Sequence, residues 1–331
     1  MGISVKSKFG DFLRTYAILL VLAGLVLLFS LITPYFFTWS NLTNIFVQQS
    51  YVVIAAVGLS FIMISGGMDL SIGFQMSLIG VTTAALHMWY GFSLPLAIVC
   101  GLLLGVILGL FNGFASITLK VHPLIITLGT MTMFQGISYI VSKQSVILNL
   151  PPAFKFFGQG YLFGWLPFSV VLMLITVAAA GFILNYTYFG RFIYALGGNE
   201  EATRLAGINI KAVKLAVFAI CGFFVAVASL VLFGRAGSAA SSTGPGTEFS
   251  AITAAFLGGI SFKGGEGRIW GLVTGVFILG ILGNGMQLIG MGTYSQYIVK
   301  GLVLLAAVGF DEYQKRGKGA KKTDAELEAA A

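Results

Sequence analysis

Long apolar stretches with few charged residues dominate the chain. Residues 15–68 and 70–119 contain no charged side chain at all. Further charge-free stretches cover 121–142, 156–190, 215–234 and 269–299. A run of about 18 apolar residues can cross a bilayer as a helix, and these runs lack the strict alternation of membrane β-strands. The pattern therefore predicts an all-α, polytopic membrane protein, because a bilayer interior leaves helices as the remaining way to satisfy the backbone.

The charges, prolines and glycine clusters divide this membrane domain, residues 16–310, into ten predicted spans. They cover about 16–32, 49–65, 70–89, 95–114, 123–142, 166–184, 213–233, 249–262, 269–287 and 294–310. Residues 1–15 and 311–331 flank the domain. If both ends are cytoplasmic, fifteen of the nineteen basic residues lie on that side, as the positive-inside rule expects. Eight spans would preserve this partition, whereas nine would not.

Composition excludes an ordinary soluble protein. Apolar residues make up 57% of the chain and charged residues only 9%, whereas soluble domains are about a quarter charged. The net charge of +8 does not indicate nucleic-acid binding, because the basic residues are scattered over loops and termini. The composition thus agrees with a protein that contacts membrane lipid along most of its length.

Two parts of the sequence resemble each other. Residues 67–71 and 246–250 have similar sequences and lie 179 positions apart, as do 101–106 and 271–276 at 170 positions. Asn112 and Asn284 then close the two copies. Five spans per copy would insert the halves in opposite directions, which predicts a 5+5 inverted repeat with Asp69 and Glu248 at opposite ends of a shared central region. Glycine-rich apolar segments also align by chance, so the repeat is a hypothesis.

A few polar residues inside the apolar stretches are candidates for a solute path. Asp69 stands between charge-free stretches of 54 and 50 residues, where a buried carboxylate is costly. It either accepts hydrogen bonds from a polar solute or caps the helix that begins near Leu70 at the cytoplasmic surface. Amides suit a neutral, hydroxyl-rich solute, although they also join helices. The predicted path residues are Ser65, Asp69, Ser71, Gln48, Asn112, Glu248 and Asn284.

The predicted cytoplasmic loop 185–212 contains a short surface helix. Asn199 is a good N-cap, Glu200 and Glu201 suit the positive end of a helix dipole, and Gly207 can end the helix. Ala202, Leu205 and Ala206 form a small apolar stripe at helical spacing. This stripe either docks in a groove of another protein or packs on the chain's own membrane domain.

Enzymatic chemistry is not indicated by the sequence. The chain has no phosphate-binding GxxxxGK[ST] loop and no HExxH motif, and its two histidines, His87 and His122, fall on opposite sides of the predicted membrane. We therefore expect no metal site and no catalytic residue, and any ATP would be handled by another chain.

Three segments carry a resemblance to a known family. They are 65–73, 195–208 and 264–268, within a similarity that covers about 16–310. The chain resembles the membrane permease subunits of bacterial ABC importers for monosaccharides, most closely the ribose-type permeases. Glu201-Ala202-Thr203-x-x-x-Gly207 is similar to the EAA-x-x-x-G loop by which such permeases engage their ATPases. That resemblance implies an ATPase-coupling surface made of Asn199, Glu200, Glu201, Ala202, Arg204, Leu205 and Gly207.

The resemblance also implies partners and a location. These are a second permease copy or homologue, cytoplasmic ABC ATPases that bind ATP and Mg²⁺, and a periplasmic or extracellular sugar-binding protein. The permease would lie in the bacterial inner membrane and translocate the sugar by alternating access, without a cofactor of its own. Two other hypotheses stay open. One is an ion- or proton-coupled secondary transporter, and the other is a branched-chain amino-acid permease of the same superfamily.

Overall fold

The protein is almost entirely helical. The structure, a computed structural model, describes residues 5–306 and 309, with side chains from residue 18 onward. The long helices are α1 (Val5–Ile32), α2 (Trp39–Ile64), α3 (Ile72–Met88), α4 (Leu94–Leu119), α5 (Pro123–Val141), α7 (Phe168–Tyr186), α10 (Ile210–Ala236) and α12 (Ile269–Leu288). The short helices are α6 (Pro152–Gln159), α8 (Tyr188–Gly198), α9 (Glu200–Leu205) and α11 (Thr247–Leu257). Residues 161–162 and 166–167 form a small hairpin, β1–β2.

The predicted spans coincide with the helices. Nine of them fall on α1, α2, α3, α4, α5, α7, α10, α11 and α12, and the tenth falls on a helical segment at 293–306. Six of these helices are long and apolar enough to cross a bilayer by themselves. Three more, Ile18–Ile32, Ile72–Met88 and Thr247–Leu257, are apolar but shorter. The all-α, polytopic prediction is confirmed, whereas the predicted tail 311–331 lies outside the described residues.

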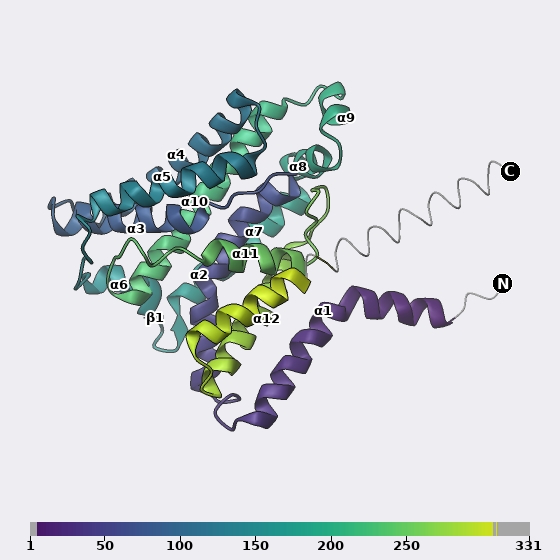
Figure 1. Cartoon of the computed structure of the whole chain (residues 1–331), viewed down its shortest axis with the longest axis horizontal. Helices are drawn as coiled ribbons and strands as arrows, with labels where there is room; N and C mark the ends of the chain where they lie inside the picture. The colour runs from purple at the N-terminus through teal and green to yellow at the C-terminus, as the bar shows by residue number, and fades with distance from the viewer. Residues whose placement is uncertain (1–4, 307–308, 310–331) are drawn as a thin grey trace.

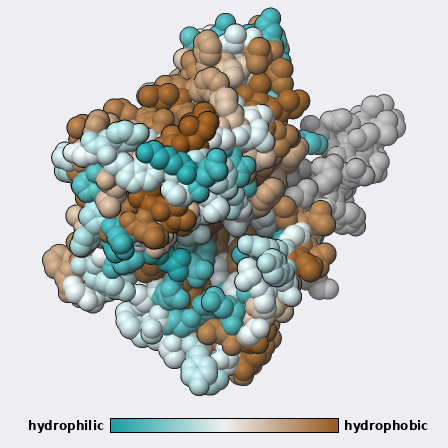
Figure 2. All heavy atoms as spheres, turned by 60° about the vertical axis from the view of Figure 1, so that its left-hand side comes forward, coloured by the Kyte–Doolittle hydropathy of each residue, from teal (hydrophilic) through white to brown (hydrophobic). Residues whose placement is uncertain are grey.

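Helices α2 and α10 form the centre of the bundle. Every residue from Val52 to Ile64 of α2 is buried, which is the pattern of a helix that is apolar all round and surrounded by protein. Helices α4 and α10 pack closely, as do α2 and α10 (Figure 1). By contrast, a third or fewer of the residues in the apolar parts of α4, α5 and α7 are buried. Figure 2 shows hydrophobic residues in broad patches on the outer surface, as expected for a protein solvated by lipid.

The connections between helices gather at two ends of the bundle. At the α9 end, defined by residues 64–67, 120–122, 187–214 and 258–268, the amide of Gly265 donates to the carbonyl oxygen of Ile64 at 2.8 Å. At the α6 end, defined by residues 89–93 and 142–167, the Lys143 ammonium lies 5.1 Å from the ring of Trp89. The basic residues Lys120, Arg191, Arg204, Lys211, Lys214, Lys263 and Arg268 belong to the α9 end.

Two non-helical chain segments enter the bundle from opposite ends, one before α3 and the other before α11. Residues 65–71 lead from the α9 end into α3, and residues 237–246 lead from the α6 end into α11. The second segment contacts the start of α3, since the amide of Gly244 donates to Oγ of Ser77 at 3.1 Å. Irregular backbone inside a membrane protein is tolerated where it is buried in protein.

The helix contacts match a two-fold relation between the halves. Helix α4 packs on α10 as α12 packs on α2, and α3 packs on α10 as α11 packs on α2. The pairs α3–α4 and α11–α12 correspond in the same way. This exchange of partners is what the 5+5 repeat predicts. A superposition of the two halves would test the repeat directly.

Candidate functional site

A buried carboxylate network joins α3 and α4. Asp69 is 1% exposed, and its Oδ1 accepts hydrogen bonds from the backbone amide and the hydroxyl of Ser71 at 2.7 and 2.6 Å. Its Oδ2 accepts from Nε2 of Gln75 at 3.1 Å and Nδ2 of Asn112 at 3.2 Å. The structure thus brings together Asp69, Ser71 and Asn112 of the predicted path, and adds Gln75, which the predicted set omitted.

The location of Asp69 corrects the simple capping interpretation. Helix α3 begins at Ile72. The backbone amide that donates to the Asp69 carboxylate belongs to Ser71, the residue before the helix. Asp69 also lies inside the bundle and not at its surface. The prediction of a surface N-cap near Leu70 is therefore wrong. Asp69 fixes the turn that leads into the helix, and its four donors offset the cost of burying it.

Glu248 lies against the same helix start from the other side. It is 1% exposed, and both of its carboxylate oxygens accept from the amide of Gly246 at 3.0 Å. A Cβ atom on Gly73 would overlap this carboxylate, so the Glu248 carboxylate lies directly against the backbone of Gly73. Asp69 and Glu248 hence both reach the beginning of α3, and the expectation that they lie at opposite ends of a central region is wrong. The segment 237–246, which contacts Gly73 and Ser77, brings Glu248 to the start of α3.

Amide side chains line a second feature, a polar cavity of about 100 Å³ between α2, α12 and the helical segment 293–306. It contains Gln48 and Asn284 of the predicted path, and sequence reasoning missed Lys300. Of the described residues that line it, none carries a carboxylate. The remaining polar lining is Gln49, Tyr51, Ser250, Gln287 and Gln296. Asn284 also exchanges two amide hydrogen bonds with Asn41, at 2.8 and 3.0 Å, which holds α12 on α2.

The predicted path residues therefore form two groups and one outlier. Gln48 and Asn284 share the amide cavity, while Asp69, Ser71, Asn112 and Glu248 surround the start of α3. Ser65 belongs to neither group, because its hydroxyl donates to the carbonyl of Ile62 at 2.8 Å and it lies at the α9 end. Sequence spacing does not reveal this division, since the members of each group come from helices far apart in the chain.

Helix α9 has the ends that the sequence predicts. Oδ1 of Asn199 accepts from the amide of Ala202 at 2.9 Å, which is an N-cap bond. Gly207 has a φ of +82°, and its amide donates to Arg204 while that of Ile208 donates to Thr203. This pair of bonds is the Schellman arrangement that ends a helix. The short surface helix is confirmed.

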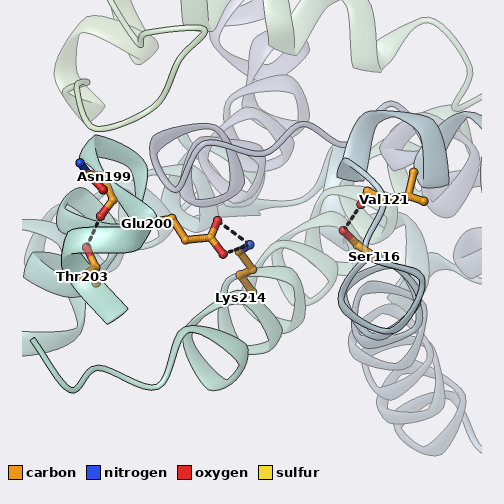
Figure 3. A network of polar contacts seen from close by, with 6 residues as sticks. All are labelled: Ser116, Val121, Asn199, Glu200, Thr203 and Lys214. Atoms are coloured by element: carbon orange, nitrogen blue, oxygen red, sulfur yellow. Dashed lines mark hydrogen bonds and ion pairs between the residues drawn. The ribbon is translucent and has the colours of Figure 1, made fainter. Parts of the chain in front are cut away.

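The apolar stripe of α9 points away from the bundle. Ala202, Leu205 and Ala206 are all exposed, Leu205 to 80%, whereas Thr203 is buried. The alternative that the stripe packs on the chain's own membrane domain is therefore wrong. Figure 3 shows how the helix is held instead: Glu200 forms an ion pair with Lys214 of α10 at 2.8 Å. Arg204 pairs with Glu201 within α9.

The three segments that carry the family resemblance converge beside α9. The loop 264–267 binds the end of α2 through the Gly265–Ile64 hydrogen bond. The Tyr194 hydroxyl of α8 donates to the carbonyl of Gly267 at 2.9 Å. Burial raises the pKa of Tyr194, and the charge of nearby Arg268 lowers it in part, so the hydroxyl stays a donor. Three segments that are distant in the sequence are thus packed together at this end of the bundle.

Comparison with known proteins shows the family to which the chain belongs. The sequence profile of the family described as branched-chain amino acid transport system / permease component matches residues 41–308. The chain belongs to this family. The permease is also 39% identical over 306 residues to the ribose import permease protein RbsC of Haemophilus influenzae, covering 91% of this chain and 93% of that one.

Two further relatives extend the comparison. The L-arabinose transport system permease protein AraH of Escherichia coli K12 is 38% identical over 316 residues, 94% of each chain. The xylose transport system permease protein XylH of the same strain is 35% identical over 350 residues, covering 85% of this chain and 89% of the relative. These relatives confirm the resemblance to ribose-type permeases. No solved structure gave a significant match.

Proposed function

We propose that this permease is the membrane subunit of an ATP-driven importer that carries a monosaccharide into the cytoplasm. The identity of 35–39% to permeases named for ribose, xylose and L-arabinose, over most of each chain, carries the proposal. All three sugars are neutral and rich in hydroxyl groups. The amide cavity supports a solute of this class over a charged amino acid, because its lining offers many donors and acceptors and a single charge, Lys300.

The α9 end is proposed to face the cytoplasm and the ATPase. It holds seven of the eleven basic residues between positions 18 and 306, as expected for a cytoplasmic face. The exposed stripe Ala202, Leu205 and Ala206 is a small apolar patch on a well-capped helix, which suits insertion into a groove. ATP and Mg²⁺ would bind only in the partner, and closure of the ATPase would shift α9. Both chain termini would then be cytoplasmic.

The opposite, α6 end would receive sugar from a binding protein. Helix α6 and the β1–β2 hairpin form its surface and pack on α7 and α10. The family resemblance implies a second permease unit beside this one, and alternating access moves one bundle against another around the substrate site. We propose a pair of permeases, with the Gln48–Asn284 cavity contributing contacts to the sugar and the Asp69–Glu248 region supporting the helices that move.

Reconstituted vesicles test the proposal. The permease, its ATPase and its sugar-binding protein would be tested for uptake of labelled ribose, xylose, L-arabinose and leucine, with ATP trapped on the α9 side. We expect uptake of at least one sugar that requires ATP, and no uptake of leucine. Gln48→Leu should raise the KM for the sugar with little effect on protein yield.

Two outcomes would contradict the proposal. Uptake driven by an ion gradient in the absence of the ATPase would indicate a secondary transporter. ATP-dependent uptake of leucine and of none of the sugars would indicate the amino-acid branch of the family.

A further inference from the structure

A large basic cavity lies between α9 and the membrane bundle. It has a volume of about 760 Å³ and is bounded by the ends of α2, α4 and α10 and the start of α5. Five of its lining residues are lysine, arginine or histidine: Lys120, His122, Arg204, Lys211 and Lys214. One lining residue, Glu200, is acidic. Figure 3 shows part of this region, with the Glu200–Lys214 pair on one side and Ser116 and Val121 on the other.

The cavity retains positive charge that its own residues do not neutralise. Glu200 forms an ion pair with Lys214, and Arg204 forms one with Glu201. Within residues 18–306, neither Lys120 nor Lys211 forms an ion pair with a carboxylate. Two lysines that converge on one cavity without counter-charges favour an anionic ligand, because the attraction between opposite charges is stronger in a partly enclosed site than in bulk water.

The rim of the cavity continues into apolar surface. The lining includes the apolar side chains of Ile117 and Phe218. Next to it on α4 and α5, Phe114, Leu119 and Ile125 are 61% to 63% exposed. An anion bound beside the two lysines would therefore lie next to a surface suited to hydrocarbon chains. A small free anion would use only the charges.

We propose that this cavity binds the phosphate headgroup of an anionic membrane lipid, with the acyl chains along the exposed faces of α4 and α5. Lys120 and Lys211 bind the phosphate, as basic pockets between helix ends at a membrane surface do. Because Glu200 and Arg204 of α9 line the same cavity, and the stripe Ala202–Leu205–Ala206 does not, the lipid contacts the side of α9 that faces away from the proposed ATPase contact.

Lipid binding can be measured on the full-length permease alone. The probe is fluorescent phosphatidylglycerol in neutral detergent micelles, compared with phosphatidylcholine that carries the same label. The test variant combines Lys120→Gln with Lys211→Gln. Each lysine near an anionic headgroup contributes about fivefold in affinity, so the double variant should bind phosphatidylglycerol about thirtyfold more weakly.

Matched variants make the result specific. Lys143→Gln with Lys155→Gln removes the same charge at the α6 end and should bind like the wild type. Lys120→Arg with Lys211→Arg keeps the charge and should retain binding, which separates loss of charge from misfolding.

Three results would overturn the proposal. The first is equal binding of phosphatidylcholine, and the second is an equal loss of affinity in the α6-end variant. The third is displacement of the probe by millimolar inorganic phosphate, which would identify a free phosphate as the ligand. The measurement needs neither ATPase nor sugar, so failure of the import proposal would leave its outcome unchanged.

Discussion

The exposed leucine of α9 gives a sharp test of the proposed ATPase contact. Leu205 is 80% exposed in the permease alone, so its truncation to alanine removes little packing there. Alanine is also the better helix former, which keeps α9 intact. If a partner groove buries Leu205, the variant loses the transfer free energy of three carbon atoms. At about 0.8 kcal/mol per buried carbon this amounts to about 2.4 kcal/mol, or roughly fiftyfold in affinity.

The assay is the Kd of the purified ATPase for the permease in nanodiscs. Leu205→Ala should weaken binding about fiftyfold and leave the thermal midpoint of the permease within about a degree of the wild type. Leu148→Ala is the matched control, since Leu148 is 62% exposed at the α6 end. An unchanged Kd for Leu205→Ala, or an equal loss for Leu148→Ala, would refute the assignment of this stripe as the contact.

Three further predictions concern the buried network and the helix ends. Asp69→Asn can place its NH2 group opposite the side-chain NH2 donors of Gln75 and Asn112. The free energy of unfolding should therefore fall by about 1–3 kcal/mol, and the thermal midpoint by several degrees. Asn199→Ala removes the cap of α9 at a cost of about 1 kcal/mol, so hydrogen exchange at the Ala202 amide should become faster. Gly73→Ala pushes a methyl group into the Glu248 carboxylate. Thermal unfolding should show that the free energy of unfolding falls by about 1–3 kcal/mol.

Two of these predictions have a control variant, and the third has an outcome that would contradict it. Gly129→Ala adds the same methyl group to α5 where no atom outside the adjacent helix backbone lies within 4 Å, and it should not lower stability, because alanine favours a helix over glycine by about 1 kcal/mol. Asn199→Asp keeps a capping oxygen and should preserve slow exchange at residue 202. A wild-type midpoint for Asp69→Asn would mean that its donors find other partners.

The helices were predictable because their signal is local. Ten apolar stretches predict ten helical segments, and the caps of α9 are visible as Asn199 and Gly207 within a dozen residues. Helix α8 was not predicted, because its apolar and polar positions stand within a loop that has no long hydrophobic run. The direction of the α9 stripe was also beyond the pattern, because an amphipathic helix does not specify which protein its apolar face contacts.

The site was predictable in its residue types but not in its grouping. Amides and carboxylates stand out in an apolar sequence, yet nothing near Gln48 indicates that it shares a cavity with Asn284. The network around Asp69 depends on Asn112, and Glu248 reaches the start of α3 from the other half of the chain. Such contacts follow from tertiary packing, which overrides a local interpretation such as the surface N-cap.

The contact between the segment 237–246 and the start of α3 has a consequence for biosynthesis. Gly244 is made 171 residues after Gly73, which takes about 9–34 s at 5–20 residues per second. During that delay the start of α3 lacks the segment that covers it. The partners of Asp69, by contrast, are complete once Asn112 has been made, 43 residues after it. The Asp69 carboxylate can thus form its hydrogen bonds within the first half of the chain, before the second half has been synthesised.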